Sequence, residues 1–331
     1  MIYDYTYRIS SVIQKFLTQL DAYRKILDIL PKLPHIEDRI RRVSLLKSSL
    51  FSAKIEGNRL NEEDIQYESV LTPKNREKLE VFNILKAQSW IYSTHVPKQL
   101  NTNLILTLHK KSMTGLSPEA GILRSEPSAI YNTAGIAVYI PPVPREILLL
   151  LKQAIAKTNK NHQLNPMDAA LFHIAFEKIH PFLDGNGRVG RLLLTYLLNR
   201  SGYGFRGIVP LNEYLDTNRQ TYYDLLAEEK TDRTEFVEFI LEGLCEQTAI
   251  IIDKIQTYHQ EQPEDILMPR RQEIIAMIRD HRMITFDFIR RRFQAVPPST
   301  LHFDLRQLIK GGFVKKVGST RGVLYILSKK D

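Results

Sequence analysis

One short segment, His180-Pro-Phe-Leu-Asp-Gly-Asn-Gly187, combines residue types that suit the binding of a phosphate group. His180 and Asp184 flank a turn with two glycines and an asparagine, which tolerate unusual backbone angles. A helix is predicted to begin at Arg188, directly after this turn. Glycines before a helix N-terminus leave backbone N–H groups free, and these groups bind phosphate. The segment therefore predicts an anion-binding loop.

Four side chains around this turn fit the chemistry of phosphate-group transfer. Arg188 and Arg191 are three residues apart and lie on one face of the first helical turn. Positive side chains oppose the dipole at a helix N-terminus, so their presence predicts an anion there. Asp184 offers a hard oxygen ligand for Mg²⁺ held with several phosphates. His180 is placed to take a proton near neutral pH.

A second interpretation places a metal hydrolase on the helix before the turn. His173, Glu177 and His180 have spacings of four and three, which put them on one helical face. The alternative role for His173 is that of a histidine packed inside the protein, which we favour.

Two helices must position the turn. The first begins with Asn165 as its cap and Pro166 at its first position, and it ends near His180 because a proline follows. The second is predicted over residues 188–198, with a buried stripe that includes Val189 and Leu192.

The rest of the chain is predicted to be mainly α. Apolar residues recur at helical spacing over residues 36–55, 72–90, 102–113, 145–156, 217–227 and 234–255. Residues 129–140 differ, because β-favouring residues there surround Asn132 and Gly135. We therefore expect a helical core domain with one small β-hairpin as a flap.

Composition excludes several protein classes. Of 331 residues, 43% are hydrophobic and 25% charged, which is typical of globular proteins and not of disordered or collagen-like chains. The length favours one large domain and a smaller unit. Cys245, the single cysteine, is predicted to be a buried thiol in a reducing compartment. Without a signal peptide or a long apolar run, we expect a soluble cytoplasmic protein.

The basic excess lies at the C-terminal end. The net charge is +9, and residues 264–331 hold 14 basic against 7 acidic residues. Residues 259–269 are polar and bounded by proline, which indicates a linker. Residues 270–331 are predicted to form three helices and two strands, a succession that resembles a winged helix. DNA binding and protein docking are equally compatible with this module, and the candidate phosphate contacts are Arg306, Lys310, Lys316 and Arg321.

The segment from His180 to Arg191 resembles, at every position, the signature His-x-Phe-x-(Asp/Glu)-Gly-Asn-Gly-Arg-x-x-Arg of the Fic (Fido) family. Enzymes of that family typically transfer AMP from ATP to a hydroxyl side chain of a target protein. The resemblance runs from about Leu104 to Leu241, and it implies the Fic fold. A phosphotransferase branch of the family has lysine in place of the second glycine, so Gly187 favours adenylylation.

The resemblance implies a role for each residue of the signature. His180 would deprotonate the target hydroxyl, and Asp184 would hold Mg²⁺. Asn186 and the backbone of Gly185 and Gly187 would bind the α-phosphate region. The β- and γ-phosphates would be held by Arg188 and Arg191, and Phe182 would anchor the loop in the core.

Two further parts of the site are implied in the same way. The flap, formed by Ile136, Ala137, Val138 and Tyr139, would align an extended target segment by strand addition. Tyr222 would line the adenine pocket, although a role as an ordinary core tyrosine stays open.

An inhibitory motif is implied upstream. Ser52-Ala-Lys-Ile-Glu56-Gly57 resembles the family pattern (Ser/Thr)-x-x-x-Glu-(Gly/Asn), carried on a helix. Ser52 and Glu56 are four apart and share a helical face, so the carboxylate could pair bidentately with a guanidinium. The implied partner is Arg191, whose pairing with Glu56 would keep it from the γ-phosphate. The alternative is a helix that merely ends at Gly57.

The sequence thus predicts an N-terminal helical region (1–100) with the inhibitory motif, a Fic core (101–258), a linker (259–269) and a winged-helix-like domain (270–331). The predicted function is a protein adenylyltransferase that uses ATP and Mg²⁺, releases pyrophosphate and modifies a Tyr, Thr or Ser hydroxyl of a target protein, itself included. The alternatives are a DNA-binding transcriptional regulator whose Fic core senses nucleotide, and an enzyme that removes AMP. We expect no membrane partner, and a homodimer stays open.

Overall fold

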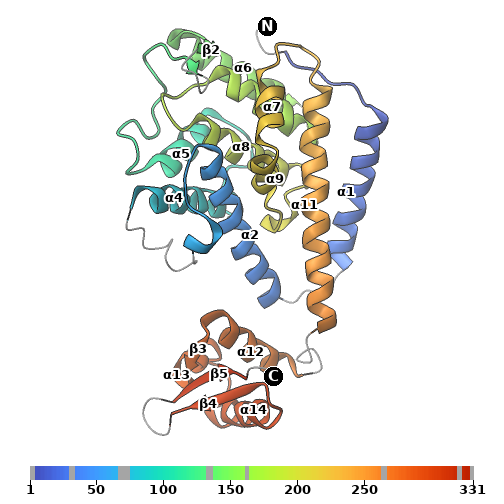
Figure 1. The fold of residues 1–331 in the computed structure, drawn as a ribbon, viewed down its shortest axis with the longest axis vertical. Helices are drawn as coiled ribbons and strands as arrows, with labels where there is room; N and C mark the ends of the chain where they lie inside the picture. The colour runs from blue at the N-terminus through green and yellow to red at the C-terminus, as the bar shows by residue number, and fades with distance from the viewer. Residues whose placement is uncertain are drawn as a thin grey trace. The chain divides into compact units, whose positions relative to one another are not determined.

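The computed structural model describes residues 4–29, 34–65, 75–131, 137–160, 164–261, 267–318 and 323–328. The chain divides into two compact units, which are Met1–Leu30 with Ile40–Ile252, and Pro31–Arg39 with Asp253–Asp331. Helices dominate both units (Figure 1), which confirms the mainly α fold class. The division into four parts at the positions given above stays a prediction.

Helices and one hairpin make up the chain as far as α11. The helices are α1 (Ser11–Ile29), α2 (Pro34–Ile55), α4 (Arg76–Ile91), α5 (Thr102–Met113), α6 (Pro144–Lys160), α7 (Pro166–Ile179), α8 (Asn186–Arg200), α9 (Leu211–Thr217), α10 (Arg219–Ala227) and α11 (Thr234–Glu261). Short 3-10 turns are η1 (Glu62–Asp64) and η2 (Phe205–Gly207).

The centre of the larger unit is the pair α7 and α8. Helices α4 and α5 pack against α8, while α6 packs against α7. Fully buried residues such as Phe176 on α7 and Leu193 on α8 form the core between these layers. Helix α7 begins where the sequence predicts, because the Asn165 side chain accepts a hydrogen bond from the backbone N–H of Asp168. The two helices thus fix both ends of the turn at 180–185.

Helix α1, which the sequence analysis did not predict, lies beside α11 (Figure 1). Its buried residues Ile13, Leu20 and Leu27 recur every seven positions. Cys245 of α11 is buried and donates its thiol to the Phe16 carbonyl of α1 at 3.6 Å. Burial raises the pKa of this thiol to about 12. The prediction of a buried cysteine is confirmed.

The hairpin consists of β1 (Ile130–Tyr131) and β2 (Ala137–Tyr139). The strands are antiparallel, with Ile130 opposite Tyr139. Residues 132–136 lie outside the described part of the chain, and so does the predicted flap residue Ile136. The expected small hairpin is therefore present between α5 and α6.

Several helix boundaries differ from the predicted ranges. Helix α4 begins at Arg76 with Asn75 as its cap, whereas the expected cap at residue 72 lies outside the described residues. The range 217–227 is divided between α9 and α10. Helix α11 continues to Glu261, six residues beyond its expected end.

The smaller unit contains α12 (Pro269–His281), β3 (Met283–Thr285), α13 (Phe286–Arg292), α14 (Pro298–Lys310), β4 (Val314–Val317) and β5 (Leu324–Leu327). The strands form an antiparallel sheet in the order β3-β5-β4. Ile278, Leu301 and Leu305 lie in its apolar core. Strand β3 was not predicted, and the winged-helix assignment stays a prediction.

In the part of the chain that the structure describes, no helix is both long and apolar enough to span a membrane.

Candidate functional site

The glycine-rich loop has a fixed shape because its own residues hold it. The Asn186 side chain accepts a hydrogen bond from the Phe182 backbone N–H at 2.9 Å and donates one to the Phe182 carbonyl at 2.7 Å. Gly185 has a φ of +84°, and an added Cβ there would lie 2.7 Å from Met113 Sδ. The buried Asn186 side chain therefore fixes the shape of the loop, a role that the sequence analysis did not anticipate, and its contact with the α-phosphate stays a prediction.

His109 of α5 packs against the loop and bonds to its backbone. Its ring stacks on that of Phe182, with centroids 3.7 Å apart. The backbone N–H of Gly121 donates to Nδ1 at 2.8 Å, so the proton of the neutral ring is on Nε2, which donates to the Asp184 carbonyl at 3.0 Å. Burial lowers the pKa of His109, which favours this neutral form. His109 therefore fixes the loop from a distant part of the sequence.

His180 lies at the point where α7 ends. Its backbone is in the left-handed region, with φ 49° and ψ 62°, and its N–H still bonds the Phe176 carbonyl. Ring atom Nδ1 faces the Glu177 carbonyl oxygen at 3.4 Å. Burial, and to a smaller extent the Arg124 guanidinium, lowers the pKa of His180 to about 4. The imidazole is therefore neutral near pH 7.

Arg191 is held by the end of α2. Its Nη2 atom lies 2.9 Å from Glu56 Oε1 and 2.8 Å from the Ser52 carbonyl oxygen, and its Nε donates to Ser52 Oγ at 3.0 Å. The expected pairing of Glu56 with Arg191 is thus present, although it uses one carboxylate oxygen and one guanidinium nitrogen, Nη2, which Ser52 shares. An added Cβ at Gly187 would overlap Glu56 Oε1, so this carboxylate lies against the first turn of α8. Gly57, with φ +97°, ends the helix.

Arg188 is held by two carboxylates. Nη1 lies 2.7 Å from Glu80 Oε1 of α4, and Nη2 lies 2.5 Å from Asp184 Oδ1. Glu80 Oε2 also accepts a hydrogen bond from the Asn58 side chain at 2.8 Å. Both arginines of the signature are therefore paired with carboxylates that stand where the sequence predicts phosphate. Glu80 carries no local sequence signal, because its partner lies 108 positions away.

The alternative of a hydrolase metal site on α7 is wrong for the described residues, where no group of three His, Cys, Asp or Glu side chains could hold a metal ion. His173 Nε2 is hydrogen-bonded to the Tyr222 hydroxyl at 2.7 Å, and its Nδ1 lies 4.0 Å from Glu177 Oε1. His173 Nδ1 and Glu177 Oε1 are both buried without a hydrogen-bond partner. Burial lowers the pKa of His173 to about 3 and raises that of Glu177 to about 8.

Tyr222 lies in the core. Besides its bond to His173, its ring packs near Phe236 and Phe239. The next residue, Tyr223, is 43% exposed, and its hydroxyl donates to the Ile55 carbonyl at 3.3 Å, next to Glu56. Consecutive residues on a helix point in directions about 100° apart. The exposed aromatic ring beside Glu56 is therefore Tyr223, which the sequence analysis missed.

The flap is attached to α7. The Tyr139 hydroxyl donates to the Lys178 carbonyl at 2.8 Å, and Lys178 Nζ lies 4.5 Å from the centre of the Tyr139 ring. Ala137 is exposed on β2, and the side chain of Val138 lies outside the described set. Tyr139 therefore ties β2 to the helix that ends at His180.

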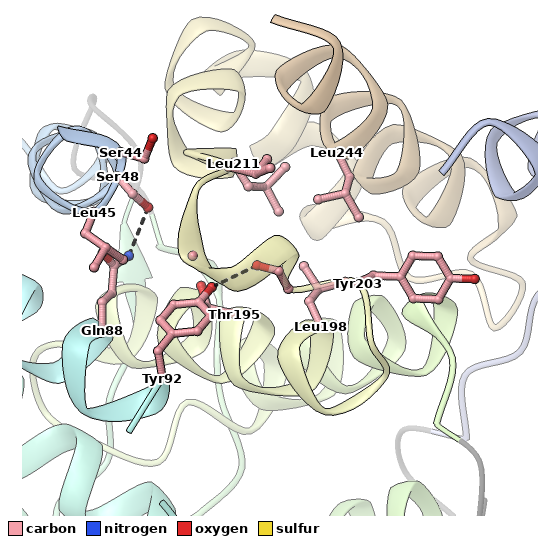
Figure 2. A pocket seen from close by; sticks show the side chains of 13 residues that line it. Ser44, Leu45, Ser48, Gln88, Tyr92, Thr195, Leu198, Tyr203, Leu211 and Leu244 are labelled. Carbon is pink, nitrogen blue, oxygen red and sulfur yellow. Dashed lines mark hydrogen bonds between the residues drawn. The ribbon is translucent and has the colours of Figure 1, made fainter. Parts of the chain in front are cut away.

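A small cleft, partly open to solvent, is lined by residues outside the glycine-rich loop (Figure 2). Its wall on α2 includes Ser44 and Ser48, and Gln88 of α4 donates to Ser48 Oγ at 2.9 Å. Asn212 donates to the same hydroxyl at 3.0 Å. Among the described residues, no charged side chain lines this cleft, so it does not fit the phosphates of a nucleotide.

The glycine-rich loop lies in a segment that matches a known protein family. Residues 99–198 match the model of the Fic/DOC family. They form a Fic domain. It spans α5 to α8 and contains the hairpin, His180 and both signature arginines. Glu56 and Glu80 lie outside this domain, so each signature arginine pairs with one carboxylate from the preceding segment.

Curated relatives carry the same domain. The chain is 30% identical to the protein adenylyltransferase Fic of Drosophila erecta over 240 residues, which are 69% of this chain and 46% of that protein. It is 27% identical to the protein of the same name from Drosophila virilis, over 81% of this chain and 55% of that protein. The chain thus spans about half the length of these relatives.

Solved structures share the fold. A Fic family protein from Desulfovibrio desulfuricans G20 has a TM-score of 0.68 at 22% identity, with 98% of both chains covered. Fic-1 from C. elegans has a TM-score of 0.61 at 24% identity, over 74% of this chain and 73% of that one. At these identities the likeness shows the fold alone, and it extends beyond the Fic domain in the first case.

Proposed function

We propose that the chain is a protein adenylyltransferase that is kept inactive by Glu56. It transfers AMP from ATP to a Tyr, Thr or Ser hydroxyl of a target protein, or of itself, and releases pyrophosphate. One observation carries the proposal: Arg191, at the helix start next to His180, is held by Glu56. The names of the curated relatives support the reaction class.

His180 is the base of the proposed reaction. Its Nδ1 faces the Glu177 carbonyl, which leaves Nε2 to accept the proton of the target hydroxyl. The hydroxyl oxygen then bonds to the α-phosphorus of ATP, and the bond from that phosphorus to the bridging oxygen breaks. Pyrophosphate leaves with the electron pair of this bond. The neutral imidazole at pH 7 is the form that this step needs.

Arg188, Arg191 and the N–H groups of the loop would hold the phosphates of ATP. Both guanidinium groups already pair with carboxylates, so phosphate would replace Glu56 and share Arg188 with Glu80. Freed from Glu56, Arg191 would hold the γ-phosphate, and the nucleotide would take the pose in which the α-phosphorus faces His180.

Asp184 fits a magnesium ion that is held mainly by the nucleotide. Its side chain is 54% exposed and has one oxygen on Arg188, so it offers a single hard ligand beside the phosphate loop. Bound there, Mg²⁺ would neutralise phosphate charge and assist the departure of pyrophosphate.

The full chain incubated with ATP and Mg²⁺ tests this function. With ATP labelled at the α-phosphate, Glu56→Gly raises self-labelling, and Glu56→Gly with His180→Ala removes it. Label at the γ-phosphate is not transferred. Matched controls are the exposed residues Glu63→Gly and His95→Ala, which leave labelling unchanged. Equal labelling of the Glu56→Gly protein with and without His180 would refute the proposal.

A second candidate function is duplex DNA binding by the smaller unit. Helix α14 exposes His302, Phe303, Arg306 and Lys310, which recur at helical spacing on one face. Such a face combines phosphate contacts with side chains that can reach base edges. The predicted contacts Lys316 and Arg321 belong to the same unit, although Arg321 lies outside the described residues.

Fluorescence polarisation of a labelled DNA duplex measures this binding. The expected result is affinity that falls steeply with salt and weakens in Arg306→Ala and Lys310→Ala. Binding that does not depend on either residue would assign the unit to protein docking instead.

A further inference from the structure

Arg124 connects the turn at His180 with the rest of the domain. It lies in the segment between α5 and β1, and the residue is 4% exposed. Its backbone N–H donates to the Pro181 carbonyl at 3.0 Å, and its Nε donates to the His180 carbonyl at 2.8 Å. One buried residue therefore holds both carbonyl groups that follow α7.

The same guanidinium holds both ends of the flap. Nη1 donates to the Glu126 carbonyl at 3.0 Å, before β1, and Nη2 donates to the Pro142 carbonyl at 2.5 Å, after β2. The guanidinium is a rigid, planar group whose donors have fixed relative directions. The base of the hairpin and the His180 backbone are thus fixed to one another by one rigid connector.

His180 needs such support. A residue other than glycine is strained in the left-handed region, and this conformation persists only where the surroundings hold it. The two bonds from Arg124 to the carbonyls at 180 and 181 hold this conformation. Tyr139 gives the flap a second attachment to the end of the same helix, through the Lys178 carbonyl.

We propose that Arg124 is a positioning residue that orients His180 relative to the flap, and so aligns the base with the hydroxyl of a segment bound along β2. The inference rests on the proposed function. Arg124 itself touches neither ATP nor target. Its loss therefore slows AMP transfer without weakening nucleotide binding, which depends on the loop and the signature arginines.

The charges around His180 provide a readout that a merely structural role would not change. Arg124 from its own segment lowers the pKa of His180, while Glu56 from α2, Asp184 from the loop and the Glu177 carbonyl raise it. Replacement of Arg124 by a neutral residue raises this pKa. The acidic limit of the pH–rate profile then moves to higher pH.

The experiment compares variants in the Glu56→Gly background. Arg124→Gln should lower the labelling rate at saturating ATP by about tenfold or more, because misplacement of a base is costly. The Kd of a non-hydrolysable ATP analogue should change less than about twofold. Arg124→Lys should stay slow, since it keeps the charge and loses the planar donors, and added guanidinium chloride should partly restore Arg124→Ala.

Arg233→Gln is the matched control. Arg233 is equally buried, and it donates to the Leu225 carbonyl at 3.2 Å and to the Glu228 carbonyl, away from the loop. Its variant should keep the rate and pH profile of the Glu56→Gly parent. An Arg124→Gln protein with the same rate and profile as that parent overturns the inference while the proposed function stands.

If the Glu56→Gly parent shows no labelling, the proposed function fails, and NMR titration still tests the positioning of His180. The imidazole of His180 should titrate at higher pH in Arg124→Gln than in Arg233→Gln. Identical titrations of the two variants overturn the inference on their own.

Discussion

Glu56 and Arg191 are 135 positions apart in the chain and meet in an ion pair of 2.9 Å. The Arg191 side chain is 1% exposed, whereas the Glu56 side chain is 25% exposed. The buried guanidinium cannot stay unpaired without a large penalty, so an anion must replace the carboxylate when Glu56 leaves. Under the proposed function, displacement of the Glu56 carboxylate and binding of phosphate would therefore be coupled at the Arg191 side chain.

Ser52 should contribute to the proposed inhibition by Glu56, because it also bonds Arg191. In Ser52→Ala, Arg191 Nε loses its acceptor inside the protein, which costs about 1.5–3 kcal/mol and weakens the hold of α2. We expect self-labelling with AMP between that of the unmodified chain and that of Glu56→Gly. Ser49→Ala, at a buried serine of the same helix that bonds Gln88 instead, is the control. An equal rise in both serine variants would contradict this role.

Glu80 should stabilise the chain most when nucleotide is absent. Glu80→Gln removes one of the two negative charges on the buried Arg188, so we expect the free energy of unfolding to fall by about 3 kcal/mol. ATP with Mg²⁺ should restore more stability to this variant than to the unmodified chain, because phosphate replaces the lost anion. Urea unfolding with and without ATP measures both values. Glu77→Gln, at an exposed position of α4, should change neither value.

Glu177 should make stability fall with rising pH between about 6.5 and 8. Burial raises its pKa to about 8, so the folded chain keeps a proton that the unfolded chain has lost. Below pH 6.5 the buried histidines, whose pKa values are lowered, give the opposite slope. The free energy of unfolding should drop by about 2 kcal/mol across the window. Glu177→Gln should remove this slope, and urea midpoints that depend on pH in the same way for both proteins would contradict it.

Replacement of Gly190 by alanine should lower the stability of the folded chain, against the usual trend in helices. Alanine in place of a helical glycine normally stabilises a protein by up to about 1 kcal/mol. At this position an added Cβ would overlap Glu177 Oε1 and lie 3.1 Å from the His173 ring. We expect Gly190→Ala to lower the free energy of unfolding by about 1–3 kcal/mol. The double variant with Glu177→Ala should recover part of this loss in thermal or urea unfolding.

Local signals in the sequence predicted the helices next to the site. Asn165 and Pro166 mark the start of α7, and Pro181 limits its end, so these boundaries depend on nearby residues only. Helix α1 was not predicted, because its stability depends on packing against α11, more than 200 positions away in the chain. The same reason explains β3, a strand of three residues that exists through its pairing with β5.

The site residues that belong to a sequence motif could be predicted. Those that only tertiary contacts bring to the site could not. His180, Asp184 and the two arginines share one short segment, and Glu56 lies in a motif of its own. Glu80, Arg124 and His109 act on that segment through tertiary contacts, and no local pattern marks them. Tyr222 and Tyr223 are neighbours in sequence, and only packing distinguishes the core residue from the exposed one.

The buried face of α2 combines the serines Ser44, Ser48, Ser49 and Ser52 with the apolar residues Leu46, Leu50, Ala53 and Ile55. Leucine and isoleucine carry far more apolar surface than serine, so withdrawal of the whole helix would place hydrocarbon in water at a cost in free energy. Displacement of the Glu56 side chain alone avoids this cost, because the carboxylate is already 25% exposed. A switch of that kind would act through one side-chain movement and would leave the packed helix in place.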